Sequence, residues 1–204
     1  IEIVAERVRR YDLRPILDPV MVSTSGSQLL KPEAKEALVK QLLSQTMVLT
    51  PNRYEAEILS GIDIEDIETA QKAARKIGEM GPEAVMVKGG HLDSKEKAID
   101  ILYTGDGFTI LEGQYHATHG THGTGCTLSS AIAAYIAKGY PIPEAAKKAK
   151  DFVNKAIKNY LDLGSGPGPV NAMANLYDEA EKAMALENIR EAISIVESEP
   201  SIRE

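Results

Sequence analysis

Short apolar runs alternate with helix-like segments through the first half of this 204-residue chain, and this alternation constrains its fold most. The apolar runs are typical of β-strands and cover residues 14–20, 46–50 and 84–88. Helical spacing is found at residues 32–44, 52–60 and 67–79. Strands that alternate with helices are joined by right-handed crossovers and form a parallel sheet. The sequence therefore predicts a layered α/β domain.

The second half of the chain follows a different pattern. Residues 98–103 and 108–112 flank Gly105-Asp106-Gly107, which is typical of an antiparallel hairpin. Helices are then expected at residues 126–138, 143–163 and 175–197, with a Gly/Pro loop ahead of the last one.

The composition excludes several classes of protein. A content of 43% hydrophobic and 26% charged residues is that of an ordinary globular domain. No run is long and apolar enough to cross a membrane, and one cysteine cannot form an intramolecular disulfide, so we expect a cytoplasmic protein. The net charge is −7, of which eight acids and three bases in residues 177–204 contribute −5. No basic stripe for nucleic acid is present.

Polar residues follow the carboxyl ends of the three expected strands. They are Asp18, Thr50-Pro51-Asn52 and Lys88-Gly89-Gly90-His91. Ligands of open parallel sheets bind outside the carboxyl ends of the strands, so these side chains should gather on one rim. Lys88 would then bind a phosphate, although a solvated strand end has the same pattern. Asn52 and Glu55 would surround Mg²⁺, or else would only cap a helix.

A glycine-rich turn, Thr121-His122-Gly123-Thr124-Gly125-Cys126-Thr127-Leu128, opens one of the expected helices. Glycines let the backbone approach a bound group, and the free N–H groups of a helix N-terminus attract anions. The turn therefore predicts phosphate binding, although a plain turn is the alternative. Cys126 lies where a helix favours the thiolate form, and it is either a functional thiol or a small buried residue.

Three evenly spaced histidines, His116, His119 and His122, precede this helix. A zinc site is not favoured, because the segment is loop-like and no thiol or carboxylate joins it at ligand spacing. We expect one of these histidines to contact a phosphate or a neighbouring loop.

Four motifs combine these residues in one order along the chain. They are Asp18-Pro19-Val20-Met21, Thr50-Pro51-Asn52-Arg53-Tyr54-Glu55-Ala56-Glu57, Val87-Lys88-Gly89-Gly90-His91 and His119-Gly120-Thr121-His122-Gly123-Thr124-Gly125-Cys126-Thr127. Together they resemble the hydroxymethylpyrimidine/phosphomethylpyrimidine kinases of thiamine biosynthesis, in the ribokinase-like superfamily. The resemblance covers about residues 14–171. It implies a three-layer α/β sandwich with a mainly parallel sheet, and two phosphorylations of a pyrimidine by ATP and Mg²⁺.

The resemblance also implies roles for individual residues. Cys126 and Lys88 would be the catalytic pair, and Val20 would contact the pyrimidine. The anion hole for the ATP phosphates would consist of Thr121, Gly123, Thr124 and Gly125. The Mg²⁺ network would consist of Asp18, Asn52 and Glu55. Cys126 stands where relatives that act on other alcohols often have an aspartate base. The expected partner is a small-molecule pyrimidine, without nucleic acid or membrane, and the expected assembly is a homodimer.

The chain departs from the family pattern at both ends. Helical spacing at Ile1, Val4, Ala5 and Val8 starts without a capping residue, and the resemblance implies a ribokinase-like fold whose N-terminal part lies outside this chain. We therefore expect a fragment with an unpaired sheet edge that is not a competent kinase alone. A kinase domain is expected at residues 1–172. An acidic helical tail is expected at 173–204, similar to the linker of archaeal fusions with a thiamine-phosphate synthase domain.

Two other functions are compatible with the sequence. The first is a pyridoxal or pyridoxine kinase of the same superfamily, which assays with the pyrimidine alcohol and with pyridoxal would distinguish from a pyrimidine kinase. A non-catalytic nucleotide- or pyrimidine-sensing module would be excluded by turnover.

Overall fold

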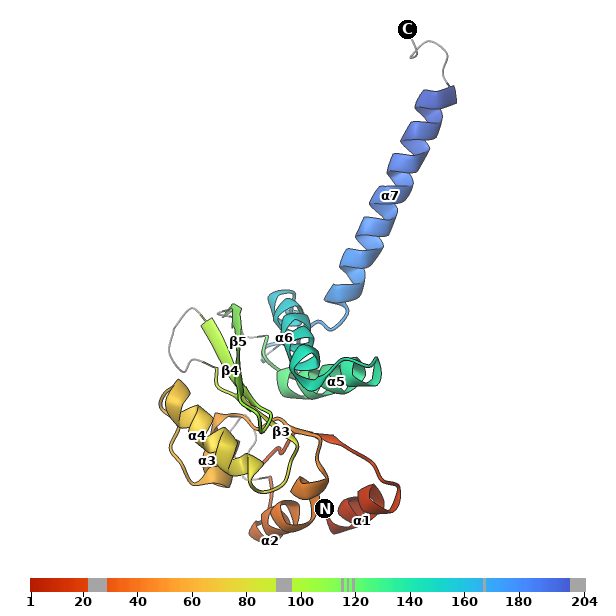
Figure 1. Cartoon of the computed structure of the whole chain (residues 1–204). Helices are drawn as coiled ribbons and strands as arrows, with labels where there is room; N and C mark the ends of the chain where they lie inside the picture. Colours follow the sequence, from red (N-terminus) through yellow and green to blue (C-terminus); the bar gives the residue numbers. More distant parts are fainter. Residues whose placement is uncertain are drawn as a thin grey trace.

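A five-stranded sheet lies between two groups of helices in the computed structural model (Figure 1). The structure describes residues 1–204 except 22–28, 91–96, 115, 117, 119, 167 and 199–204. The predicted layered α/β fold is confirmed. No helix of the described residues is long and apolar enough to cross a membrane.

The sheet combines parallel and antiparallel pairing. Its strands, in spatial order, are β1 (Ile16–Leu17), β2 (Val48–Leu49), β3 (Ala84–Lys88), β4 (Lys97–Tyr103) and β5 (Phe108–Gln114). The first three are parallel, as predicted, and β4 is antiparallel to both of its neighbours. The predicted hairpin is thus confirmed as β4 and β5. β1 and β2 are both shorter than the predicted strands at 14–20 and 46–50. β1 ends early because the chain turns after it, where the Val20 N–H donates to the Asp18 carbonyl.

One core joins the sheet to the N-terminal helices. These are α1 (Glu2–Arg10), α2 (Pro32–Ala37), α3 (Arg53–Ser60) and α4 (Ile67–Gly78). α2 continues through a π turn (Leu38–Leu42) and a 3₁₀ turn (Leu43–Gln45), so helical backbone covers the predicted segment. Val85 and Val87 of β3 lie in this core with Ile77 of α4. In α1, Ala5 and Val8 are buried as expected, but Val4 is exposed.

A second core lies on the opposite face of the sheet. It packs α5 (Thr124–Ala137) and α6 (Ile142–Lys158) against Ala84 and Met86, the residues of β3 that alternate with those of the first core. Period-two alternation along β3 therefore separates the two cores. α6 ends earlier than predicted, because the chain after it folds back and the N–H of Leu161 donates to the Pro169 carbonyl.

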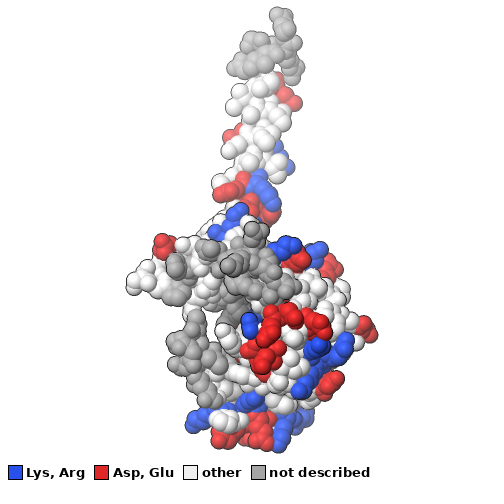
Figure 2. Space-filling view, turned by 90° about the vertical axis from the view of Figure 1, so that its left-hand side faces the viewer, with Lys and Arg blue, Asp and Glu red and all other residues white. Residues whose placement is uncertain are grey.

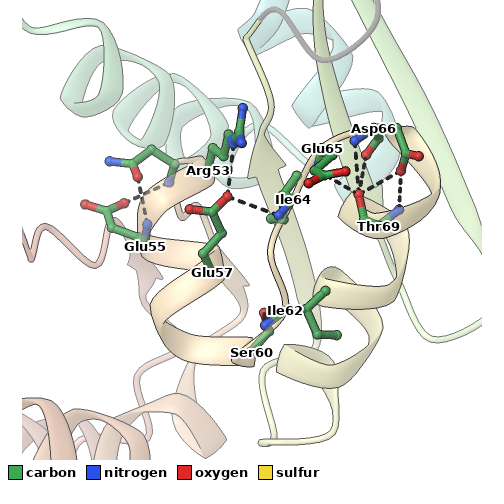
Figure 3. A network of polar contacts seen from close by, with 10 residues as sticks. Arg53, Glu55, Glu57, Ser60, Ile62, Ile64, Glu65, Asp66 and Thr69 are labelled. Atoms are coloured by element: carbon green, nitrogen blue, oxygen red, sulfur yellow. Dashed lines mark hydrogen bonds and ion pairs between the residues drawn. The ribbon is translucent and has the colours of Figure 1, made fainter.

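Side-chain caps fix the starts of α3 and α4 (Figure 3). The Asn52 amide oxygen accepts from the Glu55 N–H at 2.9 Å, and the Glu55 carboxylate accepts from the Asn52 N–H at 2.8 Å. Asp66 and Thr69 form the equivalent capping box at α4. α3 ends at Gly61, whose φ of 67° is a left-handed conformation that favours glycine. The sequence predicted this end.

The last helix, α7 (Ala174–Ser198), projects away from the layers (Figure 1). It touches α6 only near its start, where Asn175 Nδ2 donates to the Phe152 carbonyl and Lys155 pairs with Asp178. Ala174 is its one buried residue. A helix was expected over residues 175–197, close to these bounds. On the face shown in Figure 2, uncharged residues lie between its charged side chains, and apolar side chains such as Ile189 and Ile193 are exposed as well.

Candidate active site

One cavity of about 750 Å³ opens where β1, β2 and β3 end. All ten site residues expected from the sequence line it: Asp18, Val20, Asn52, Glu55, Lys88, Thr121, Gly123, Thr124, Gly125 and Cys126. Parallel strands bring their carboxyl ends to one edge, which explains why segments far apart in the chain meet there. The structure thus brings these residues together, while their chemical roles stay predictions.

An ion pair joins the ends of β1 and β3 inside the cavity. Lys88 Nζ donates to Asp18 Oδ1 at 2.7 Å, and the two side chains are only 18% and 13% exposed. The Thr50 hydroxyl donates to the same carboxylate oxygen at 3.3 Å. Lys88 is therefore held against the cavity wall, and its interpretation as a solvated strand end is wrong.

Backbone pairing fixes the position of Lys88. Its N–H donates to the Pro51 carbonyl at 2.8 Å, and Lys88 forms an isolated parallel bridge with Asn52. These contacts continue the parallel pairing beyond the end of β2 to the last residue of β3. The lysine consequently lies beside the N-terminus of α3.

The glycine-rich turn approaches this ion pair so closely that a side chain at Gly125 would displace one of the two charged groups. A Cβ atom at Gly125 would lie 2.9 Å from Asp18 Oδ2 and 3.2 Å from Lys88 Nζ. Gly123 is the N-cap of α5 and has a φ of 84°, which favours glycine. The helix begins at Thr124, slightly earlier than predicted. Its first N–H groups, which have no partners within a helix, form the positive end beside the cavity.

The turn is anchored from behind by the loop that follows α6. His122 pairs with Pro169 in an isolated bridge, and the Val170 N–H donates to the His122 carbonyl at 3.1 Å. Gly120 lies against the Tyr160 side chain, which an added Cβ would overlap. The Thr124 hydroxyl donates to the Thr121 carbonyl at 2.5 Å. These contacts fix the direction in which α5 starts.

Glu55 is both a helix cap and a buried acid. Its residue is 1% exposed, and its second carboxylate oxygen accepts from the Met21 N–H at 3.3 Å. Burial raises the pKa of this carboxyl, while the Asn52 N–H and the charge of Lys88 oppose the rise. The capping interpretation from the sequence is thus confirmed, and Glu55 also faces the cavity.

Cys126 and Val20 are the more accessible members of the site. Cys126 is exposed in the first turn of α5, so it is not the buried small residue that was the alternative. It also borders a second cavity of about 480 Å³ along α5. Val20 is 46% exposed at the cavity mouth.

The histidines form no metal site among the described residues. No group of three His, Cys, Asp or Glu side chains that could hold a metal ion is found in that part of the chain. His122 lines the cavity and contacts the neighbouring loop, whereas His119 lies outside the described residues.

Sequence reasoning missed a second ion pair in the cavity wall. Lys150 Nζ of α6 donates to Asp100 Oδ2 of β4 at 2.6 Å, and each residue is 6% exposed. The available signal was a lysine on the buried face of α6, beside Ala146, Ala149 and Val153. Buried charges are normally paired, so this position required a carboxylate partner.

These features define a class of protein. A lysine–carboxylate pair and a glycine turn at a helix N-terminus surround one cavity at the carboxyl ends of a parallel sheet. On a three-layer α/β sandwich, this is the architecture of a ribokinase-like kinase. The chain belongs to the phosphomethylpyrimidine kinase family, which it matches over residues 1–171.

Individual relatives carry two kinase names. The hydroxymethylpyrimidine/phosphomethylpyrimidine kinase of Synechococcus elongatus is 42% identical over 86% of this chain and 67% of its own length. The pyridoxine kinase of Bacillus subtilis is 39% identical over 85% of this chain and 65% of its own. The Staphylococcus aureus pyridoxal kinase in complex with AMP-PCP superimposes with a TM-score of 0.78 and 36% identity, over 85% of this chain and 63% of that one. The chain spans about two thirds of these relatives.

Proposed function

We propose that the protein carrying this chain uses ATP to phosphorylate 4-amino-5-hydroxymethyl-2-methylpyrimidine and then its monophosphate, in thiamine biosynthesis. Membership of the phosphomethylpyrimidine kinase family supports this substrate class. The observation that carries the proposal is the close approach of Gly125 to the Asp18–Lys88 pair. It combines backbone donors and a cation at one point of the cavity, which suits a phosphate.

Phosphoryl transfer depends mainly on positioning and charge stabilisation. Lys88 would donate to the oxygens of the transferring group, while the N–H groups of residues 123–126 would receive developing negative charge. Thr121 and Thr124 would hold the turn in shape, since the hydroxyl and the N–H of Thr124 both donate to the Thr121 carbonyl. Val20, at the cavity mouth, would contact the pyrimidine through its backbone.

The donor set near α3 fits Mg²⁺. Asp18, Asn52 and Glu55 offer hard oxygen atoms around the same cavity, and Mg²⁺ accepts few protein carboxylates because it keeps several waters. Asp18 Oδ1 holds Lys88, while Oδ2 lies toward Gly125. When bound, the ion would supply neutralisation of phosphate charge. The chain's own contribution is to hold both carboxylates in place.

Cys126 would orient or deprotonate the attacking hydroxyl. Its exposure at the start of α5 gives it access to the cavity, and a general base contributes about 10²–10⁴ in rate. We expect Cys126→Ala to lose part of kcat together with a thiol-like ionisation in the pH profile, and Cys126→Asp to stay active. The base role is excluded if that ionisation persists without the thiol.

Pyridoxal or pyridoxine phosphorylation is the second candidate. The Bacillus subtilis pyridoxine kinase and the Staphylococcus aureus pyridoxal kinase favour it, since their identities to this chain are close to that of the Synechococcus enzyme.

The experiment compares the phosphorylation of the hydroxymethylpyrimidine and of pyridoxal by the protein that carries this chain. Each alcohol is incubated with ATP and Mg²⁺, and the phosphorylated product is followed by phosphorus NMR. A higher kcat/KM for the pyrimidine supports the proposal, and a higher value for pyridoxal reverses it. Binding of ATP without turnover of either alcohol would indicate the non-catalytic sensing module instead. Sedimentation velocity on the same sample tests the expected homodimer.

A further inference from the structure

The cavity contains two lysine–aspartate pairs that share one wall. Asp18 and Lys88 form the first, and Asp100 and Lys150 form the second. Lys88 and Asp100 are direct partners across the antiparallel β3–β4 ladder. Side chains directly opposite each other point to the same face of a sheet, with Cβ atoms about 4.5–5.5 Å apart. Asp100 is therefore a second carboxylate within reach of Lys88.

The observed pairing keeps Lys88 away from this neighbour. Lys88 Nζ lies on Asp18 at 2.7 Å, while Asp100 Oδ2 is occupied by Lys150 at 2.6 Å. The other oxygen, Asp100 Oδ1, accepts from the Gly89 N–H at 3.2 Å. Both carboxylate oxygens are thus engaged, and neither contacts Lys88.

The contact with Gly89 ties this pair to the end of β3. The Gly89 N–H also donates to the Ile99 carbonyl, and the Ile99 N–H donates to the Gly90 carbonyl. Gly89 and Gly90, directly after Lys88 at the end of β3, therefore oppose Ile99 of β4, as in a β-bulge. Asp100 supports this bulge from the side of the cavity.

The absence of a side chain at Gly113 leaves room for Lys150 to reach Asp100. The path from α6 crosses β5 at Gly113, where an added Cβ would lie 2.8 Å from Lys150 Cε and 2.4 Å from Asn154 Nδ2. Lys150 lies on the buried face of α6, with Ala146, Ala149 and Val153. A lysine in such a place is retained only with a partner, because an unpaired buried charge is unfavourable.

We propose that Lys150 is a positioning residue: it neutralises Asp100 and so leaves Lys88 paired with Asp18, available to an anionic group at the glycine-rich turn. Without Lys150, the buried Asp100 carboxylate would draw Lys88 across the ladder and away from Gly125. The proposal rests on the proposed kinase function for its rate effects, but the choice of partner by Lys88 does not depend on that function.

The test uses the asymmetry between the two members of the pair. Lys150→Met should lower kcat on the order of 10²-fold, since displacement of a reacting group by about 1 Å has that effect, with a smaller change in KM for ATP. Asp100→Asn should keep kcat within a few-fold, because Lys88 has no competing carboxylate. The double variant Asp100→Asn/Lys150→Met should recover kcat, and Lys150→Arg should resemble the wild type. Lys147→Met, on the exposed side of α6, is the matched control.

Other outcomes overturn the proposal. A double variant as slow as Lys150→Met would show that Lys150 acts on the ligand itself, and an unchanged kcat in Lys150→Met would show a passive pair. Thermal unfolding confirms that each variant is folded in the assay. If Lys150→Met does not fold, the double variant is used alone, because it leaves no buried charge unpaired. A kcat close to the wild type then supports the proposal, and a kcat about 10²-fold lower overturns it.

A structural measurement separates this inference from the proposed function. Nitrogen NMR of the lysine ammonium groups, or a crystal structure, should show Lys88 on Asp100 in Lys150→Met and on Asp18 in the wild type. If neither alcohol is phosphorylated but the partner changes, the kinase proposal fails and the positioning inference stands. If the alcohols are phosphorylated and Lys88 stays on Asp18 in Lys150→Met, the positioning inference fails alone.

Discussion

Helices α6 and α7 are both long and rich in apolar residues, yet only α6 joins the core. Along its 17 residues α6 buries one face against α5 and the sheet. α7 has 25 residues and buries only Ala174, while Met184, Ile189 and Ile193 are each more than half exposed. The apolar residues of α6 recur at helical spacing, whereas those of α7 are distributed around its axis. The spacing of apolar residues, more than their number, therefore decides which helix packs.

The chemistry follows the same division. α6 contributes Lys150, Val153, Asn154 and Ile157 to the cavity wall, and no residue of α7 lines the cavity. Substitutions around the cavity and in the α5–α6 core should therefore have large effects, and matched substitutions in α7 should have small ones.

The largest effect is expected at Lys88. Lys88→Met should lower kcat by about 10²–10³ and change KM for ATP much less, because a charge that acts on the transition state affects mainly kcat. Steady-state kinetics test this, with Lys182→Met in α7 as the control that should leave kcat unchanged. An unaltered kcat in Lys88→Met would contradict the view that residues lining the cavity carry out the chemistry.

The next largest effect is expected on the free energy of unfolding, in a comparison of two isoleucines. Ile132 of α5 is fully buried and Ile189 of α7 is 56% exposed. Ile132→Ala should reduce the free energy of unfolding by about 2–5 kcal/mol, because it leaves a cavity in the core. Ile189→Ala should change it by less than about 0.5 kcal/mol. Urea unfolding measures both, and similar losses would show that α7 is packed in solution.

A smaller, pH-dependent effect is expected at Glu55. Burial raises the pKa of this carboxyl above its ordinary value of 4.5, so the folded state holds the proton more tightly than the unfolded state. The stabilisation is fully present below the unfolded pKa and is lost as the pH rises through the folded one. The stability of the wild type relative to Glu55→Gln should therefore fall as the pH rises above 4.5. Unfolding free energies at a series of pH values measure this difference, and the opposite slope would contradict the raised pKa.

The smallest effect is expected from removing most of α7. Ending the chain after Asp178 keeps the contacts of Asn175 and Asp178 with α6. No residue of α7 beyond that point is buried, so the free energy of unfolding should change by less than about 0.5 kcal/mol. A larger loss in urea unfolding would show that the projecting part of α7 has a partner surface.

Much of the fold and the site could be predicted because the signals were local. The limits of β3 matched the prediction, since its apolar run ends at Lys88 before two glycines. The capping box of α3 and the glycine turn of α5 were also visible as short motifs. Where the motifs followed strand ends, parallel topology then brought them to one cavity.

Features that depend on contacts between distant segments could not be predicted. The early end of α6 follows from a loop that folds back, so that Leu161 bonds to Pro169. The exposure of Val4 in α1 follows from which side of that helix meets the core. Neither leaves a sign in the local pattern.

The sequence by itself therefore determined the order of strands and helices, the hairpin, the glycine turn and the residues that would line the site. Only the tertiary structure decided which lysine pairs with which aspartate. Lys88 has Asp100 directly opposite in the ladder, yet it bonds to Asp18 while Lys150 takes Asp100. That choice depends on β-strand register and on the packing of α6 over Gly113, and such long-range geometry arises only when the layers assemble.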